Sequence, residues 1–480
     1  MNILIYRFYR VLEFINYLQQ TKLKQIMRKL TLLTLMMMGM VWNAKAQDST
    51  AAAADDGKIT LSGYLDTYYN HAFNNPRSNS LLGPGAAGRA FDRTVDQFSL
   101  GLVQIKTTYS SSKVDIVADL TFGPNAELGN FGNVNNLAYN QGAGAGLTGT
   151  TGVTGVSLYQ SKPFANLYGT SAAIKQAYGT WKATSKLSFT VGQFGTHIGY
   201  EVIDAPINYH YSLSNLFNNG PFYHIGAKAN YAFSDKLALM VGLVNNWDNL
   251  FDNNKTKSVI AQLYVKPVTG FNVYLNFIGG NGDDTYLSSI GHNAAGLGVN
   301  NLNVNTGNYN RYLYDLTTGY QVTKKFYVGL NAAYGYYVAN NNLTKASIIA
   351  FSETQSNKSK FQHGGKSTLD WGGAAIYLNY AINDWLGIGI RGEHFEDFWG
   401  VRYIGGVGGS LDMNGNSTGR RVGAINNSIT ITAPITLANG HFILKPEFRF
   451  DGSDNYIYEN SKGQSVKQQE TIGLAAIFKW

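Results

Sequence analysis

The last ten residues, Thr471-Ile472-Gly473-Leu474-Ala475-Ala476-Ile477-Phe478-Lys479-Trp480, form an amphipathic pattern that ends on an aromatic residue. With the period of two that a β-strand imposes, alternate residues from Ile472 to Trp480 share an apolar face. A closed barrel in lipid must pair its last strand with its first, because an open edge leaves backbone groups without hydrogen-bond partners. This ending predicts the closing strand of an outer-membrane barrel, with Phe478 and Trp480 as its assembly signal; an ordinary edge strand is the alternative.

The beginning of the chain has the three parts of a secretory signal peptide. Met27 is followed by Arg28-Lys29, by an apolar stretch over 30–41, and by Ala44-Lys45-Ala46. This order matches a positive n-region, an h-region and an A-x-A cleavage site. The apolar stretch is too short for a spanning helix, which needs about 20 residues. We therefore expect export across the inner membrane, with cleavage after Ala46.

These features predict three parts of the chain. Residues 1–46 are an N-terminal prefix and signal peptide, in which Met27 is the better start and 1–26 are either a long n-region or an upstream start. Residues 47–57 form a short periplasmic segment, too short for a plug domain. Residues 58–480 form an outer-membrane barrel of a Gram-negative cell.

Removing the predicted signal peptide changes the charge of the chain. Lys plus Arg falls from 38 to 31 because seven lie in 1–46, and Asp plus Glu falls from 30 to 29. The mature net charge is then +2 instead of +8, which gives no reason to expect nucleic-acid binding.

The composition of the chain also indicates its class. The 54 Gly, 32 Tyr and 25 Phe, with only 14% charged residues, are typical of a transmembrane barrel. The chain contains no cysteine, which excludes disulfides and thiolate metal sites.

Segments of alternating apolar and polar residues recur along the mature chain and predict about 16 strands. The expected strands are 58–70, 94–108, 113–123, 172–182, 186–196, 222–233, 236–247, 256–267, 270–280, 310–321, 325–338, 369–381, 385–398, 421–433, 440–452 and 468–480.

The connections between these strands alternate between short and long. Tight turns such as 183–185 and 322–324 follow the even-numbered strands, and long Gly- and Asn-rich stretches such as 124–171 and 453–467 follow most of the others. One rim of an outer-membrane barrel carries short periplasmic turns and the other carries long extracellular loops. The fold class is therefore all-β, a transmembrane antiparallel up-and-down barrel.

Charged residues share one face of several strands. On 440–452, Phe448 and Phe450 oppose Lys445, Glu447 and Arg449, and a charge facing lipid would cost about 2–4 kcal/mol. A barrel of this size is wide enough for an aqueous channel. The charges either create a transverse field in the channel or brace its wall. The predicted pore-lining residues are Asp66, Lys106, Asp115, Asp119, Lys175, Lys228, Lys266, Arg391, Glu393, Lys445, Glu447, Arg449 and Asp451.

Two further features concern the membrane and the lumen. Aromatic residues near strand ends predict girdles at the two membrane interfaces. The stretch 197–221 has the aromatic and apolar content of a loop that packs inside the barrel as a constriction. Its candidate residues are His197, Tyr200, Glu201 and Asp204, and 124–171 is the alternative loop. The predicted girdle residues are Tyr64, Tyr68, Tyr69, Trp181, Tyr231, Phe233, Trp247, Tyr320, Tyr336, Tyr337, Tyr380, Trp385, Trp399 and Trp480.

Four stretches, spread from the first to the fifteenth strand, resemble a known family. The chain is similar to the putative beta-barrel porin-2 (OmpL-like) proteins of Bacteroidota outer membranes. The resemblance implies an outer-membrane porin without catalytic residues. The resembling stretches are Ser62-Gly63-Tyr64-Leu65-Asp66-Thr67-Tyr68-Tyr69, Gly220-Pro221-Phe222-Tyr223-His224-Ile225-Gly226, Arg391-Gly392-Glu393-His394-Phe395-Glu396-Asp397 and Lys445-Pro446-Glu447-Phe448-Arg449-Phe450-Asp451.

These observations predict a passive channel for small hydrophilic solutes. The alternatives are a surface adhesin or structural barrel with a plugged lumen, and a substrate-specific channel for oligosaccharide or phosphate. We expect no enzyme, cofactor or metal site, because no hydrolase or metal-binding motif occurs, although calcium in the loops stays open. The expected partners are outer-membrane lipid and lipopolysaccharide, the barrel-assembly machinery through the last strand, and small hydrophilic solutes; homo-oligomerisation stays open.

Overall fold

The computed structural model describes residues 57–81, 89–131, 173–248, 256–281, 309–340, 367–402, 419–421 and 423–480, together with 345, 348–349 and 352–353. The chain divides into two units, 1–56 and 57–480, and the described residues all belong to the second. The predicted signal peptide, its cleavage site and the periplasmic segment, apart from Gly57, therefore lie outside the described residues and stay predictions.

Sixteen antiparallel strands form a closed barrel, as the sequence predicts. The sheet has 17 strands, of which the three-residue β15 (Ile435–Leu437) continues the wall after β14. The first strands are β1 (Lys58–Ala72), β2 (Phe98–Ser110), β3 (Val114–Phe122), β4 (Ile174–Lys182), β5 (Leu187–Gly195), β6 (Tyr223–Ser234), β7 (Leu237–Val244) and β8 (Ser258–Val265). The others are β9 (Phe271–Asn281), β10 (Tyr309–Gln321), β11 (Phe326–Ala339), β12 (Thr368–Ala381), β13 (Gly387–Asp397), β14 (Ala424–Thr432), β16 (Phe442–Ser453) and β19 (Gln468–Lys479).

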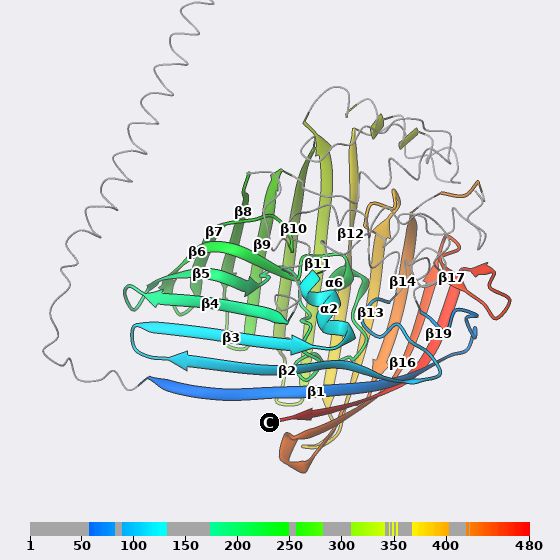
Figure 1. The fold of residues 1–480 in the computed structure, drawn as a ribbon, viewed down its shortest axis with the longest axis horizontal. Helices are drawn as coiled ribbons and strands as arrows, with labels where there is room; N and C mark the ends of the chain where they lie inside the picture. Colours follow the sequence, from blue (N-terminus) through cyan, green and yellow to red (C-terminus); the bar gives the residue numbers. More distant parts are fainter. Residues whose placement is uncertain are drawn as a thin grey trace, which may run out of the picture. The chain divides into compact units, whose positions relative to one another are not determined.

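The last strand closes the barrel against the first. β19 pairs antiparallel with β1, from Tyr64 opposite Lys479 to Ala72 opposite Thr471. Beyond the end of β19, the Trp480 backbone N–H donates to the Gly63 carbonyl at 3.1 Å, and the Gly63 N–H donates to the Trp480 carbonyl at 3.3 Å. Figure 1 shows β19 beside β1 at the bottom of the barrel. The predicted closing strand is therefore confirmed.

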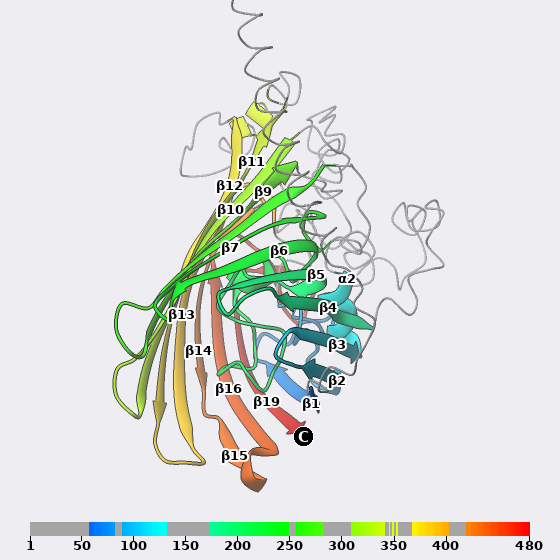
Figure 2. The ribbon, with the colours of Figure 1, turned by 90° about the vertical axis from the view of Figure 1, so that its left-hand side faces the viewer.

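Short and long connections sort to opposite ends of the strands. The β2–β3, β4–β5, β6–β7 and β12–β13 connections are tight turns and define a short-turn rim; the opposite end is the long-loop rim. Figure 2 shows the strands and their short turns from the side. Within the long connections the structure describes helices α2 (Pro124–Phe131) and α6 (Asn215–Asn218), and the small sheet of β17 (Tyr458–Glu459) and β18 (Ser465–Val466). The rest of the predicted loop 124–171 lies outside the described residues.

Several strand boundaries differ from the predicted ones by a few residues, and two differences have a local cause. β2 begins at Phe98 instead of 94, because Thr94 forms a bridge to Ser80 and Asp96 adopts a positive φ of 56°. Positive φ is rare for a residue with a side chain and interrupts the extended backbone. After β14, the short connection between the expected strands 421–433 and 440–452 contains β15 and a 3₁₀ turn, η3 (Ala438–Gly440), which ends one residue into the second expected strand.

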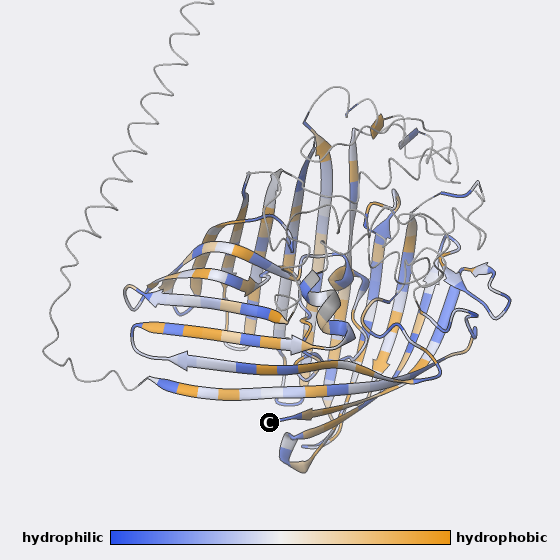
Figure 3. Cartoon of the chain, in the orientation of Figure 1, coloured by the Kyte–Doolittle hydropathy of each residue, from blue (hydrophilic) through white to orange (hydrophobic). Residues whose placement is uncertain are grey.

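The two faces of the strands differ in polarity. Along β7, Leu237, Leu239, Val241 and Leu243 are exposed on the outer face, where they suit lipid. Along β16, the inward Lys445, Glu447, Arg449 and Asp451 are buried. Figure 3 shows this alternation as apolar and hydrophilic bands along single strands. Among the described residues, no helix is long and apolar enough to span a membrane.

The predicted aromatic girdles are only partly correct. Trp181, Trp385 and Trp480 are more than half exposed on the outside, as interfacial residues should be. Other predicted girdle residues point inward and are buried, because aromatic residues near strand ends also fill the barrel. These buried residues are Tyr64, Tyr68, Trp247, Tyr337 and Trp399.

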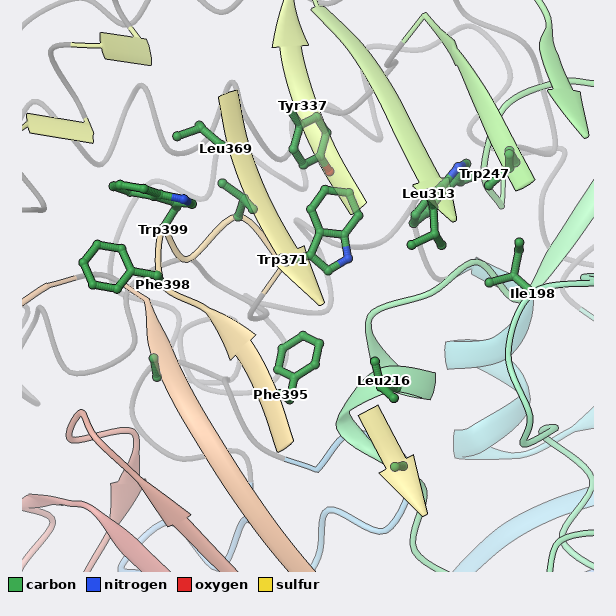
Figure 4. Packing of buried hydrophobic residues seen from close by; sticks show 14 of the residues in the cluster. Ile198, Leu216, Trp247, Leu313, Tyr337, Leu369, Trp371, Phe395, Phe398 and Trp399 are labelled. Atoms are coloured by element: carbon green, nitrogen blue, oxygen red, sulfur yellow. The ribbon is translucent and has the colours of Figure 1, made fainter. Parts of the chain in front are cut away.

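A cluster of buried apolar side chains fills the barrel towards the long-loop ends of β10 to β13. Tyr337 packs against Trp371 with ring centroids 5.0 Å apart, and Trp371 lies 6.2 Å from Trp247. Figure 4 shows Ile198 and Leu216, which belong to the connection after β5, on the side of this cluster near Leu313 and Trp371. The interior of the barrel is therefore partly occupied by the chain itself.

Candidate functional site

The connection between β5 and β6 lies inside the barrel; we call residues 196–222 the luminal segment. Its first part contacts β9 and β10, where the His197 ring pairs with the Phe277 carbonyl and the Gly199 N–H donates to Asp315. Its middle part contacts β14, where His210 pairs with Thr432 at 2.7 Å. The luminal segment thus crosses the lumen and is fixed to distant strands.

Carboxylates on the wall accept the backbone N–H groups of the luminal segment. Glu447 accepts from Tyr211 at 2.8 Å and from Ser212 at 3.1 Å. Glu393 accepts from Asn215 at 2.9 Å and Leu216 at 2.8 Å, at the start of α6. The first N–H groups of a helix have no partner within the helix, and an acceptor there satisfies them. These wall acids therefore replace water for a buried loop backbone.

Wall cations complete the anchoring. Arg391 donates to Glu201 of the luminal segment at 2.6 Å and to the Ser212 carbonyl at 2.7 Å. Lys445 donates to the Ala205 carbonyl at 2.7 Å and also to that of Asn208, and Arg449 donates to the Leu213 carbonyl. Arg391 and Glu201 are both buried, so the loss of one of them would leave the charge of the other uncompensated.

Glycines in the wall make room for tyrosines of the luminal segment. A Cβ atom on Gly387 would lie 2.2 Å from the Tyr209 hydroxyl, and one on Gly329 would lie 2.5 Å from the Tyr200 hydroxyl. Tyr200 also stacks on Tyr377 of β12 at 4.2 Å. The inner surface of the barrel is thus shaped to fit the luminal segment.

Burial also sets the protonation of the histidines in the luminal segment. Burial lowers the pKa of His197 to about 4, because the charged imidazole would lose its hydration. Burial, followed by the positive charges of Arg391, Lys445 and Arg449, lowers the pKa of His210 well below its usual value. Both rings are therefore neutral at pH 7.

A cavity of about 580 Å³ lies beside the first half of the luminal segment. Its lining combines residues 195–204 with side chains from β4, β8, β9, β10 and β11. The residues from β9 to β11 belong to the strand halves nearest the short-turn rim, such as Asn272, Thr318 and Tyr327. Cavities of this size and mixed polarity are typical of small-molecule sites.

The predicted pore-lining and constriction residues lie in different surroundings. Those that contact the luminal segment directly are Asp66, Lys175, Arg391, Glu393, Lys445, Glu447 and Arg449. Asp119 and Asp451 contact the luminal segment only through another side chain, Asp119 through Gln104 and Asp451 through Arg449. Asp115 pairs with Lys182 near a short turn, and Lys228 lies over the ring of Phe194 at 4.3 Å. Lys106 and Lys266 are half-buried on the wall.

Each predicted constriction residue either contacts a wall side chain or lines the cavity. Glu201 binds Arg391, and Asp204 accepts from Lys175 at 2.5 Å and from Gln104 at 2.9 Å. His197 and Tyr200 line the cavity. Among the described residues, no group of three or more His, Cys, Asp or Glu side chains is placed to hold a metal ion.

Sequence reasoning missed one buried anchor on β10. Asp315 accepts from the Gly199 N–H at 3.0 Å, from Asn276 at 2.7 Å and from Asn331 at 2.5 Å. The sequence pattern indicates that the Asp315 side chain faces inward, since Asp315 lies four residues after Arg311 on the same strand face and opposite Asn276 in the adjacent strand. The sequence could not show which loop would reach it.

A barrel of 16 antiparallel strands with an apolar outer face, a charged interior and a loop folded into the lumen defines an outer-membrane porin. The chain belongs to the family described as putative beta-barrel porin-2, OmpL-like, which matches residues 58–480. This family places the protein in the outer membrane as a channel. No curated protein matches the chain.

Several solved structures are similar to this chain over most of its length at very low identity. OmpT of Vibrio cholerae, in its trimer form, is 10% identical, with a TM-score of 0.46 over 89% of this chain and 100% of that one. OprB of Pseudomonas putida is 12% identical, with a TM-score of 0.48 over 88% and 94%. The anion-selective porin of Comamonas acidovorans is 8% identical, with a TM-score of 0.46 over 88% and 100%. The assignment to the porins rests on the family.

Proposed function

We propose that the barrel is a passive diffusion channel for small hydrophilic solutes and that the luminal segment is its constriction. The observation that carries this proposal is the anchoring of residues 196–222 across the lumen by buried wall charges such as Arg391, Glu393 and Glu447. A fixed loop inside a wide barrel narrows the aqueous path without blocking the lumen. The cavity of about 580 Å³ beside it leaves space for solutes of modest size.

The wall charges then act mainly as braces. Arg391, Lys445 and Arg449 all donate hydrogen bonds to carboxylates or carbonyls within the described residues. This supports the bracing alternative over a transverse field for these positions. The proposal includes no catalytic role, in keeping with a family of channels.

A second candidate is a structural or adhesive barrel whose lumen is closed. It is favoured by the buried apolar cluster around Trp371 and Tyr337, which fills the interior towards the long-loop rim. Such a barrel would hold its shape but pass no solute. Contacts with lipopolysaccharide and with the assembly machinery, and homo-oligomerisation, stay predictions for both candidates.

Liposome swelling separates the two candidates. Purified protein in liposomes should admit small neutral solutes at rates that fall with solute size, as diffusion through a narrow constriction requires. Liposomes that contain the protein but swell no faster than empty ones would favour the closed barrel.

A further inference from the structure

The further inference concerns the cavity beside the luminal segment. The residues of β8 to β11 that line this cavity, which we call its aromatic floor, include two tyrosines and carry no charge. Tyr274 and Tyr327, on β9 and β11, are half-buried at the cavity surface. The Tyr274 ring lies 5.0 Å from that of Tyr264, which extends the aromatic surface along β8. A tyrosine offers an apolar ring face together with a polar hydroxyl.

Amide groups beside these rings keep hydrogen-bonding capacity for a solute. The Tyr264 hydroxyl donates to Asn272 Oδ1 at 2.9 Å, which orients the amide so that Nδ2 is the donor left for another group. Gln262 donates through Nε2 to Asn276 Oδ1 at 2.8 Å, which leaves its Oε1 as an acceptor. The cavity therefore presents an oriented donor and an oriented acceptor near aromatic faces.

The charged groups that line the same cavity are compensated by partners within the protein. Lys175 lies 2.5 Å from Asp204, and Glu201 lies 2.6 Å from Arg391. His197 is neutral at pH 7, since burial lowers its pKa to about 4. A charged solute entering the cavity would lose water and meet no uncompensated opposite charge among the described residues, which is costly.

We propose that this cavity is a binding site for neutral, polyhydroxylated solutes of the sugar class. Sugar rings have apolar C–H faces that pack on aromatic rings, and their hydroxyl groups both donate and accept hydrogen bonds. The aromatic floor and the amides at Asn272 and Gln262 match both properties. The inference rests on the proposed function in one respect, that such solutes reach the cavity through the barrel.

Calorimetric titration of the detergent-solubilised, full-length mature barrel tests binding without requiring conduction. Maltotriose is the neutral probe, and trigalacturonate and inorganic phosphate are the charged probes. We expect maltotriose to bind at least tenfold more tightly than either charged probe. We expect Tyr274→Ala to weaken maltotriose binding by about tenfold, the scale of one lost aromatic contact.

The matched control is Tyr314→Ala on β10, because Tyr314 is half exposed on the outer face of the barrel. This variant should bind maltotriose as the wild type does. Asn272→Ala gives a second cavity variant that removes the donor and leaves the aromatic ring of Tyr274. The gel mobility of unheated samples shows whether each variant is a folded barrel.

The results separate this inference from the proposed function. Maltotriose binding that Tyr274→Ala weakens supports the site even if liposome swelling shows a closed barrel, which would overturn only the channel. The sugar site would be overturned if solutes entered the liposomes but maltotriose did not bind. It would also be overturned if phosphate or trigalacturonate bound more tightly than maltotriose, or if Tyr274→Ala and Tyr314→Ala had equal effects on maltotriose binding.

Discussion

At the scale of single residues, the interior of the barrel is organised by buried charges that hold a loop. Arg391 is completely buried, yet it bonds to Glu201, to the Ser212 carbonyl and to Thr430. A buried ion pair adds little net stability, but the loss of one partner is strongly destabilising. These residues therefore decide whether the luminal segment stays in place.

Arg391→Met should release the luminal segment, because Glu201 would be left as a buried charge without its partner. We expect a cost of about 3–5 kcal/mol to the docking of the segment. Limited proteolysis of the folded barrel should then cut within 196–222. The control is Lys182→Met, which breaks the ion pair of Lys182 with Asp115 near a short turn. Both side chains of this pair are about a third exposed. Such pairs contribute about 0–1 kcal/mol, so equal proteolysis of the two variants would contradict the anchoring.

Acid should loosen the luminal segment through its buried histidines. The folded pKa of His197 is about 4, below its usual value of 6.5, and that of His210 is also lowered. Between pH 6.5 and 4 the released segment binds protons that the docked segment does not, so docking is strongest above pH 6.5 and weakens as the pH falls through this window. Proteolysis within 196–222 should rise over the same range. His197→Gln with His210→Gln should flatten this rise; an unchanged pH profile would refute the assignment.

At the scale of elements, the strands could be predicted from sequence and the loop contacts could not. The expected strand 325–338 compares with β11 at Phe326–Ala339 because a strand between lipid and a polar lumen repeats its pattern every two residues. The partner of Glu201 is 190 positions away in the sequence, and no periodicity indicates such a pair. Similarly, Trp247 resembles a girdle residue in sequence, and only the fold shows that it is buried.

The fit between the wall and the luminal segment can be tested at Gly387 of β13. Gly387→Ala should displace Tyr209, because the new Cβ would lie 2.2 Å from its hydroxyl oxygen. We expect a cost of about 1–3 kcal/mol, the usual range for overpacking. Adding Tyr209→Phe removes that oxygen and should restore the thermal stability and protease resistance of the wild type. Gly392→Ala is the control, since its Cβ would have ordinary contacts. No recovery in the double variant would contradict the proposed fit.

At the scale of the whole molecule, β19 closes the barrel against β1, and we predict that Trp480 contributes to this closure. Deletion of Trp480 removes both backbone hydrogen bonds with Gly63 and the ring that lies over this glycine. We expect a lower yield of folded barrel in the outer membrane, measured as the heat-modifiable band on a gel. Lys479→Gln keeps the backbone pairing and should give the normal yield. A normal yield after deletion of Trp480 would argue against its role in assembly.

Single-channel recording in planar bilayers shows whether this barrel is a channel and whether residues 196–222 narrow it. The recordings compare the wild type with a variant in which 198–220 are replaced by a short Gly-Ser linker. We predict small, stable conductance steps for the wild type and steps several times larger for the folded variant. Equal conductance in the two proteins, or no conductance in either, would contradict this prediction.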